Sequence, residues 1–261
     1  MSESHVAESP ATASPVGTFA EDRYTDFYAR QAASPTLRAI YRDAYGEDYP
    51  EELDPFGFVT RADLARITEL VALEAGARLV DLGCGRGGPG LSVAAATGAR
   101  LVGVDVVAGA VVDAARRSRA LGVADSRFTV GSFTDIGLPD GSCAAAMSVD
   151  ALWMVLDKHA AMAEVHRVLA PGGRFVFTTW EPDRVDHVAL LTQAGFTVLV
   201  REETGDWFRR QRAVYDGIVD AADRLRVELG EQGATVLLAE ARETPEVLAG
   251  TPRLLVAARR D

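Results

Sequence analysis

A glycine-rich segment carries the most specific chemistry in this chain. Residues 81–88 read Asp-Leu-Gly-Cys-Gly-Arg-Gly-Gly and directly follow a short apolar run. Glycines at the end of a strand let a ligand lie against bare backbone, close to the positively polarised start of the next helix. Many dinucleotide sites use such a loop, and glycines also allow close helix–strand packing, so the loop alone leaves the ligand open.

Two carboxylates narrow the class of ligand. Asp81 stands two residues before Gly83, and Asp105 stands twenty residues beyond Gly85, at the end of the next apolar run. A carboxylate at position 81 can accept hydrogen bonds from an ammonium group or orient a water, whereas it would repel a pyrophosphate. An acid at the place of Asp105 binds ribose hydroxyls, although it could instead cap the following helix. The pair predicts a ligand that joins a ribose to a cationic amino-acid end.

The segments around this loop predict an α/β fold. From Ala77 to residue 204, short apolar runs alternate with helical stretches, which is typical of a parallel sheet covered on both faces. Before it, the residues look helical, with Thr60 as the N-cap of one helix and Asp63 at its third position. After it, apolar residues from Val214 to Leu229 recur every three or four residues and predict one helix, followed by a second over residues 232–242.

The glycine motif and its acids resemble those of a known family. Asp81-x-Gly83-x-Gly85-x-Gly87 with Asp105 resembles motifs I and II of the class I methyltransferases that depend on S-adenosylmethionine (SAM). Similarity extends over residues 60–200, and the Gly-Gly-Pro extension of the loop is similar to small-molecule methyltransferases of the rebeccamycin sugar O-methyltransferase and quinone C-methyltransferase types. The resemblance implies a Rossmann-like, seven-stranded, mostly parallel sheet with helices on both faces.

The resemblance and the periodicity together divide the chain into four parts. We expect a disordered tail (1–19), an N-terminal helical lid (20–75), a SAM-binding domain (76–204 and 251–261) and a helical lid inserted between the last two strands (205–250).

The resemblance also assigns residues to the parts of SAM. The methionine end is expected on Asp81, Gly83, Cys84, Gly85 and Gly87. Asp105 is expected on the ribose, Val106, Ser132 and Phe133 around the adenine, and Asp150 near the sulfonium. Many relatives have an acid in place of Ser132, so Asp135 is an alternative reader of the adenine amino group.

The acceptor side is less specific. Many small-molecule members have a histidine where this chain has Trp153 and Met154, and we expect both residues to face the substrate. Methyl transfer from a sulfonium depends mainly on positioning, and a general base helps only when the acceptor holds a proton. His187 is the candidate base, and an exposed histidine at a helix start is the competing interpretation.

Aromatic residues from both lid segments have two interpretations. Tyr24, Tyr28, Trp207 and Tyr215 could form a wall around the sulfonium and substrate, because cations favour ring faces. They could equally form the apolar core of the lid. Tyr24 and Tyr28 are assigned to the cofactor, and the other two to the substrate.

Composition limits the remaining classes. The net charge of −11 and the lack of a basic cluster argue against nucleic-acid binding. The two cysteines suggest a reducing, cytoplasmic location, no apolar run is long enough to cross a membrane, and no His/Cys cluster predicts a metal site. We expect a monomer or homodimer.

We therefore predict SAM-dependent methyl transfer to the O, N or C atom of a small molecule, in secondary metabolism, with S-adenosylhomocysteine (SAH) as product. A SAM-binding scaffold or cyclisation catalyst that transfers no methyl is an alternative. An NAD-dependent oxidoreductase is disfavoured, because the short-chain type needs Tyr-x-x-x-Lys and the one lysine, Lys158, follows Met154 at that spacing.

Overall fold

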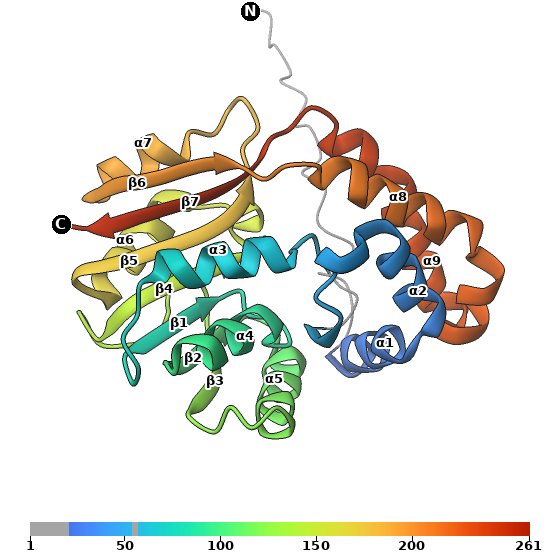
Figure 1. Cartoon of the computed structure of the whole chain (residues 1–261), viewed down its shortest axis with the longest axis horizontal. Helices are drawn as coiled ribbons and strands as arrows, with labels where there is room; N and C mark the ends of the chain where they lie inside the picture. The colour runs from blue at the N-terminus through green and yellow to red at the C-terminus, as the bar shows by residue number, and fades with distance from the viewer. Residues whose placement is uncertain (1–20, 54–56) are drawn as a thin grey trace, which may run out of the picture.

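A seven-stranded sheet forms the centre of the molecule. The computed structural model describes residues 21–53 and 57–261, with side chains from residue 27 onward (Figure 1). The strands are β1 (Arg78–Leu82), β2 (Arg100–Asp105), β3 (Ser126–Val130), β4 (Cys143–Val149), β5 (Leu169–Trp180), β6 (Phe196–Glu203) and β7 (Arg253–Arg260). They lie in the order β3-β2-β1-β4-β5-β7-β6, and only β7 runs antiparallel to its neighbours. The predicted Rossmann-like sheet is confirmed.

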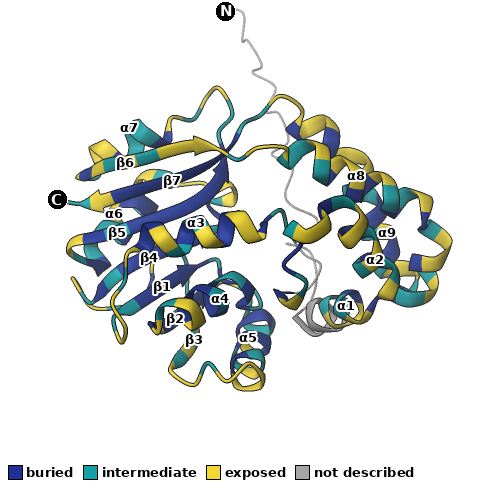
Figure 2. Cartoon of the chain, viewed as in Figure 1, coloured by how far each residue is buried: buried dark blue, intermediate teal, exposed yellow. Residues whose placement is uncertain are grey.

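Helices cover both faces of this sheet. The strands alternate their side chains between two apolar cores, so that Leu79 and Val80 of β1 are both fully buried but in different cores. One core holds α3 (Arg61–Val71) and α4 (Gly88–Thr97), and the other holds α6 (Lys158–Val168) and α7 (His187–Gln193). Helix α5 (Ala108–Ala120) packs beside β2 and β3. Figure 2 shows the central strands buried and the outer helix surfaces exposed.

Four further helices gather beside the sheet. They are α1 (Glu21–Ala33), α2 (Pro35–Tyr45), α8 (Trp207–Asp220) and α9 (Ala222–Leu248). Side chains of α2, α8 and α9 form an apolar core of their own, which includes Leu37, Val214 and Leu238. Helix α3, in contrast, packs on the sheet although it lies within residues 20–75. The proposed division of the chain into four parts stays a prediction.

The long helix expected over Val214–Leu229 is wrong. Helix α8 ends at Asp220 and α9 begins at Ala222, so the apolar face continues across one residue that is not helical. The helical geometry is interrupted a second time at Gly230, where φ is +76°. A periodic pattern records which side chains are buried, and two helices that pack on the same core preserve it.

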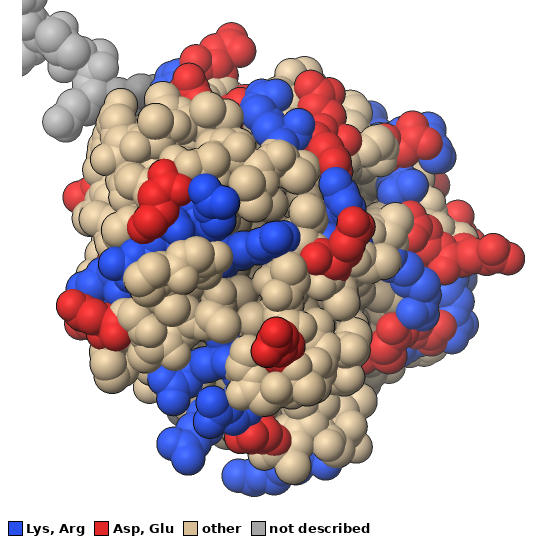
Figure 3. Space-filling view, turned by 60° about the vertical axis from the view of Figure 1, so that its left-hand side comes forward, with Lys and Arg blue, Asp and Glu red and all other residues tan. Residues whose placement is uncertain are grey.

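The surface of the molecule carries charges of both signs. On the face shown in Figure 3, basic and acidic side chains lie interspersed. Within the part of the chain that the structure describes, no helix combines the length and apolarity that a bilayer crossing requires.

The start of α3 is fixed by a capping box, as the sequence predicted. Thr60 Oγ1 accepts a hydrogen bond from the N–H of Asp63 (3.0 Å), and Asp63 Oδ2 accepts one from the N–H of Thr60 (3.2 Å). Both side chains are buried. The reciprocal bonds satisfy two backbone donors that the first turn of a helix leaves free.

Replacing Thr60 with Ala should lower the free energy of unfolding by about 1 kcal/mol, because the N–H of Asp63 loses its acceptor. Urea unfolding followed by circular dichroism measures the difference. Thr60→Ser keeps the hydroxyl and should stay close to wild type. Equal losses in both variants would mean that the methyl group, and not the cap, is what matters.

Candidate active site

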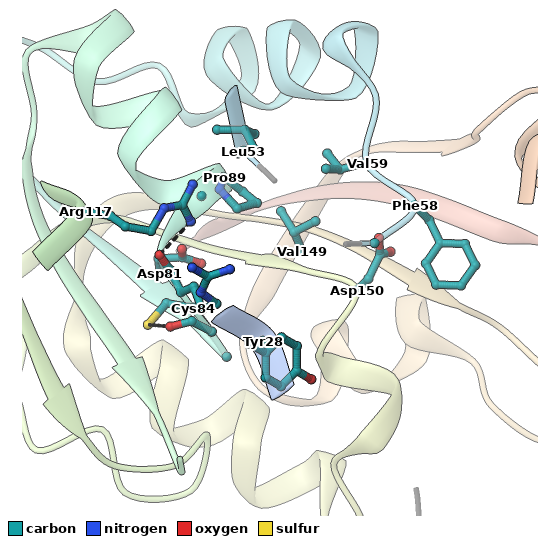
Figure 4. A pocket seen from close by; sticks show the side chains of 15 residues that line it. Tyr28, Leu53, Phe58, Val59, Asp81, Cys84, Pro89, Arg117, Val149 and Asp150 are labelled. Carbon is teal, nitrogen blue, oxygen red and sulfur yellow. Dashed lines mark hydrogen bonds between the residues drawn. The ribbon is translucent and has the colours of Figure 1, made fainter. Parts of the chain in front are cut away.

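A cavity of about 200 Å³ lies at the carboxyl ends of β1 and β4 (Figure 4). One part of its wall is polar and contains Asp81, Arg86 and Arg117. Another part is apolar and contains Leu53, Phe58, Val59 and Val149. The glycine loop after β1 forms the floor between them. The cavity therefore offers a charged end and an apolar end to one ligand.

The glycine loop takes a shape that other residues adopt with difficulty. Gly83, Gly85 and Gly87 all have positive φ (+68°, +51° and +81°). A Cβ added to Gly83 would lie 2.4 Å from Cβ of Ala151, so the loop also needs the missing side chain. The turn ends at Gly87, the N-cap of α4, and brings the backbone of the loop into the cavity wall.

Asp105 fixes the loop from the neighbouring strand. One oxygen of its carboxylate accepts from the N–H of Gly85 (2.8 Å), and the other accepts from the N–H of Val107 (2.9 Å). The residue at the N-cap of α5 is Val107, so Asp105 does not cap that helix in the usual way. The carboxylate is partly exposed beside the loop, where a ribose could reach it.

Asp81 is buried without a hydrogen-bond partner for one of its oxygens. The residue is 2% exposed, and Oδ2 has no hydrogen-bond partner of good geometry, although the nearby N–H of Gly90 acts to lower the pKa. Burial, and then the nearby charge of Asp105, raise the pKa of the Asp81 carboxyl to about 7. Gly90 on α4 allows this packing, since a Cβ there would lie 2.4 Å from Oδ2. An incoming ammonium group would supply the missing donor and favour the ionised form.

The residues expected around an adenine lie at the ends of β2 and β3, outside the wall of this cavity. Val106 is 68% exposed, which leaves an apolar surface beside Asp105. Phe133 is buried, 3.5 Å from the place of a Cβ on Gly83. Ser132 Oγ accepts from the N–H groups of Thr134 and Asp135, so its lone pairs are used within its own turn. The adenine assignments stay predictions.

Asp150 is held in an unusual backbone conformation by groups from two strands. Its φ is +54°, and its N–H donates to both the carbonyl oxygen and Oγ1 of Thr178 (3.1 Å each). Its carboxylate accepts two hydrogen bonds from the buried guanidinium of Arg253, from Nε (2.8 Å) and Nη2 (2.9 Å). Asp150 lines the cavity, and its place near a sulfonium stays a prediction. The arginine that holds it was not predicted.

Of the two tyrosines of α1, Tyr28 lines the cavity. The side chain of Tyr24 lies outside the described residues. Trp153 and Met154 are largely exposed, at 43% and 52%. Neither is part of this cavity's wall, and their contact with a substrate stays a prediction.

Trp207 belongs to a cluster of four aromatic rings beside the cavity. Trp180 lies at its centre, with ring centroids 4.6 Å from Phe58 and 5.7 Å from both Trp153 and Trp207. Of these rings, Phe58 lines the cavity. The sequence analysis identified neither Phe58 nor Trp180, which stand in a turn-rich segment and at the end of an apolar strand.

The expected substrate contact of Tyr215 is wrong. The residue is 3% exposed and packs in the lid core with Tyr41 and Tyr45. Its hydroxyl donates to Glu240 Oε1 (3.3 Å). Burial, and then the charge of Glu240, raise the pKa of Tyr215 well above its ordinary value. The core interpretation of this tyrosine is the one that the structure supports.

His187 does not lie at the mouth of the cavity, and it is not exposed. It is fully buried at the start of α7, where its ring packs near Phe177 and Nδ1 lies 2.8 Å from Glu181 Oε2. Burial lowers the pKa of the imidazole although Glu181 opposes this shift. The residue is absent from the cavity wall, so the geometry gives no support to a role as general base. Its burial follows from the carboxylate partner, which the sequence did not reveal.

Among the described residues, no group of three or more His, Cys, Asp or Glu side chains could hold a metal ion. Cys84 and Cys143 are both buried free thiols, and burial raises the pKa of each. Cys84 lines the cavity from within the glycine loop.

The sequence resembles known methyltransferases over different lengths. A family model described as a methyltransferase domain matches residues 80–177. Methyltransferase GfsG of Streptomyces halstedii is 27% identical over 237 residues, which cover 80% of this chain and 84% of that protein. The 24-methylenesterol C-methyltransferase 2 of Oryza sativa subsp. japonica is 36% identical over 123 residues, or 46% of this chain. That match covers 34% of the rice protein, so the chain spans about a third of its length.

Solved structures share the fold over most of the chain. The cyclase SpnF has a TM-score of 0.70 at 20% identity, and the match covers 91% of this chain and 95% of SpnF. A geranyl diphosphate methyltransferase in complex with SAM has a TM-score of 0.58 at 21% identity, with 77% and 85% covered.

The raised pKa of Asp81 predicts that SAH binds more weakly in acid. Below pH 7 the carboxyl of the free protein is protonated, and a proton must leave before the ligand's ammonium can pair with it. We expect roughly tenfold weaker binding at pH 6 than at pH 8. Calorimetric titration in several buffers measures both the affinity and the released proton. Asp81→Asn should bind weakly at every pH, and a wild-type affinity that ignores pH would contradict the assignment.

Gly83→Ala should lower both thermal stability and SAH affinity, because the new Cβ meets Ala151 and the positive φ is strained. Gly122→Ala is a matched control, since Gly122 has a φ of +70° but no atom within 4 Å of the added Cβ. The control should lose only the backbone contribution, about 1–2 kcal/mol, and should bind SAH normally. Melting curves with and without SAH compare the two, and normal binding by Gly83→Ala would show that the contact with Ala151 is unimportant.

Proposed function

The chain contains a class I SAM-dependent methyltransferase domain, and we propose that it transfers the methyl group of SAM to an apolar small-molecule acceptor. The observation that carries the proposal is the buried carboxylate of Asp81, which lacks a donor for one oxygen at the edge of the cavity. A cationic amino-acid end fits this carboxylate, and a pyrophosphate does not. The raised pKa of the Asp81 carboxyl agrees with this, because a nearby cation would stabilise the ionised form and lower that pKa.

The remaining residues fit the rest of the same ligand. The Gly83–Gly87 backbone would lie along the methionine end, and Asp105 would accept from ribose hydroxyls next to the exposed side chain of Val106. When bound, SAM supplies an electrophilic methyl group on a sulfonium. The protein then contributes position, since orienting two reactants can supply roughly 7–11 kcal/mol of the barrier.

The apolar part of the cavity supports an apolar acceptor. Leu53, Phe58, Val59 and Val149 line it, and the carboxylate of Asp150 is paired there with Arg253, which also pairs with Asp63. These side chains exclude water from a reacting centre and offer few directed hydrogen bonds. The name of one similar protein, a sterol C-methyltransferase, supports the same class of acceptor. A place in secondary metabolism stays a prediction.

A second function is favoured by one comparison. SpnF, which is named as a [4+2]-cyclase, shares the fold over 91% of this chain. The alternative for this chain is therefore a protein that binds SAM and catalyses ring closure without methyl transfer. The two functions differ in whether SAM is consumed.

Thermal shift and product analysis test the proposal together. SAM or SAH at a hundred times its Kd should raise the melting temperature by roughly 5–10 °C, whereas NAD should have no effect. Conversion of SAM to SAH is then followed with geranyl diphosphate, farnesol and naphthol as acceptor probes. Binding with turnover supports methyl transfer, binding without turnover on any probe favours the cyclase-like alternative, and stabilisation by NAD alone would overturn both.

Asp105→Ala should weaken SAM binding by at least about tenfold, because the ribose loses its acceptor and Gly85 loses its anchor. Asp135→Ala tests the alternative contact to the adenine and should weaken binding less, because that side chain is exposed. Calorimetry on both variants compares the two acids. Unchanged affinity in Asp105→Ala would remove the ribose assignment.

A further inference from the structure

Four segments of the chain meet at the side chain of Arg253, which stands at the start of β7 and is 1% exposed. Its guanidinium donates to both oxygens of Asp150 (2.8 and 2.9 Å), to Oδ2 of Asp63 (2.9 Å) and to Oγ1 of Thr204 (3.1 Å). We call these four residues the Arg253 hub. The hub joins the end of β4, the start of α3 and both ends of the helical insertion.

Three segments of the hub each carry an aromatic ring, and a fourth ring stands on β5, the strand that pairs with the segment of Arg253. Trp153 follows Asp150 by three residues, Trp207 follows Thr204 by three residues, Trp180 pairs with Arg253 in the register of β5 and β7, and Phe58 precedes the capping box that contains Asp63. These are the four rings of the aromatic cluster around Trp180. The hub therefore sets the relative positions of the segments from which the rings project.

The aromatic cluster stands between two cavities. Phe58 lines the cavity beside Asp81, whereas Trp153 and Trp180 line an outer cavity of about 960 Å³. The outer cavity lies between the η4 turn (Leu152–Met154), α7 and the end of α9. Much of its lining is apolar and includes Leu156 and Val247, which are 97% and 66% exposed. The four rings thus form a wall with a cofactor side and an outer side.

The guanidinium of Arg253 stays charged although it is buried, and its planar shape fixes the directions of its hydrogen bonds. Burial lowers the pKa of the Arg253 guanidinium, but the charges of Asp150 and Asp63 outweigh burial and raise the pKa overall. A planar guanidinium can donate in several fixed directions at once, which an ammonium group cannot do in the same geometry. Removing the guanidinium would leave two largely buried carboxylates without their counter-charge.

We propose that Arg253 is a positioning residue that assembles the aromatic wall, and that an apolar acceptor binds against this wall. The second half rests on the proposed function, because it assumes that an acceptor is brought to SAM. The first half concerns the chain alone. Arg253 acts through the segments that it joins and touches neither the glycine loop nor Asp105 in the contacts described above.

Intrinsic fluorescence reads the wall directly, since the three tryptophans of the chain are all members of it. Arg253→Lys keeps the positive charge but loses the planar guanidinium that bonds to three partners at once. The segments around Trp180 should then move apart, and Trp180 should become accessible to water. We expect emission at longer wavelength and roughly twofold stronger quenching by acrylamide, with an SAH affinity within about threefold of wild type. Arg66→Lys is the matched control, because Arg66 makes an exposed pair of ion pairs with Glu69 and Glu202. The control should leave fluorescence unchanged.

A second variant covers the case in which Arg253→Lys does not fold. Asp63→Asn keeps an acceptor for the capping box and weakens only the α3 arm of the hub, so it should alter the fluorescence in the same direction. Wild-type emission and quenching in a folded Arg253→Lys, or in Asp63→Asn if the first does not fold, would overturn the positioning role. A tenfold loss of SAH affinity with wild-type fluorescence would also overturn it, because Arg253 would then act on the cofactor through Asp150 and not on the wall.

The acceptor half has its own readout. In wild type saturated with SAH, farnesol or naphthol should change the tryptophan emission, and the same probe should bind about tenfold more weakly to Arg253→Lys. No change with either probe would overturn acceptor binding at the wall while leaving the fluorescence result on Arg253 intact. If wild type does not bind SAH at all, the proposed function fails, and the comparison of Arg253→Lys with Arg66→Lys is still decisive for the wall.

Discussion

The burial of one carboxylate without a full set of donors is the constraint on which the cofactor end of the structure depends. Asp81 stands at the end of a fully buried strand, where an ionised acid is costly. Gly90 leaves the space into which its oxygen fits, and Asp105 adds a second negative charge nearby. The glycine loop then keeps every bulky side chain away from the same point. The buried carboxylate, the neighbouring charge of Asp105 and the open glycine loop do little to stabilise the folded chain by themselves. Together they form a negatively charged site with room for a cation.

The direction of one strand explains how the acceptor end is built. Parallel strands β1, β4 and β5 all finish at the edge of the sheet where the cavity lies. An antiparallel strand starts at the edge where its parallel neighbours finish. Reversal of β7 therefore places its first residue, Arg253, beside the end of β4 and opposite Trp180. A parallel last strand would carry that arginine to the far edge of the sheet.

The fold and the glycine loop could be predicted from the sequence because both depend on residues that are close together in the chain. Apolar runs of strand length, glycines at fixed spacing and the capping box at Thr60 need no knowledge of distant residues. Arg253 could not be found in this way, because its partners are 49 to 190 residues away in the chain. His187 was misplaced for a different reason: its partner Glu181 is only six residues away, but no periodic pattern in the sequence shows that the two side chains meet and allow the polar ring to be buried. Tyr215 allowed two interpretations, and only packing could choose the lid core.

The helical insertion, α8 and α9, is joined to the sheet at two adjacent positions, the end of β6 and the start of β7. The N–H of Thr204 donates to the carbonyl oxygen of Arg253 (2.9 Å), so the insertion leaves the sheet and returns at neighbouring positions. Its helices nevertheless share an apolar core with α2 and are hydrogen-bonded to it. The Tyr45 hydroxyl donates to Gln211 Oε1 (2.9 Å), and Glu228 accepts from the N–H of Thr36 and from the hydroxyl of Ser34. An evolving chain can thus exchange this module without disturbing the sheet, provided that residues near the amino terminus change in step. Acceptor preference in such a protein would be inherited as a matched pair of segments separated by more than half of the polypeptide.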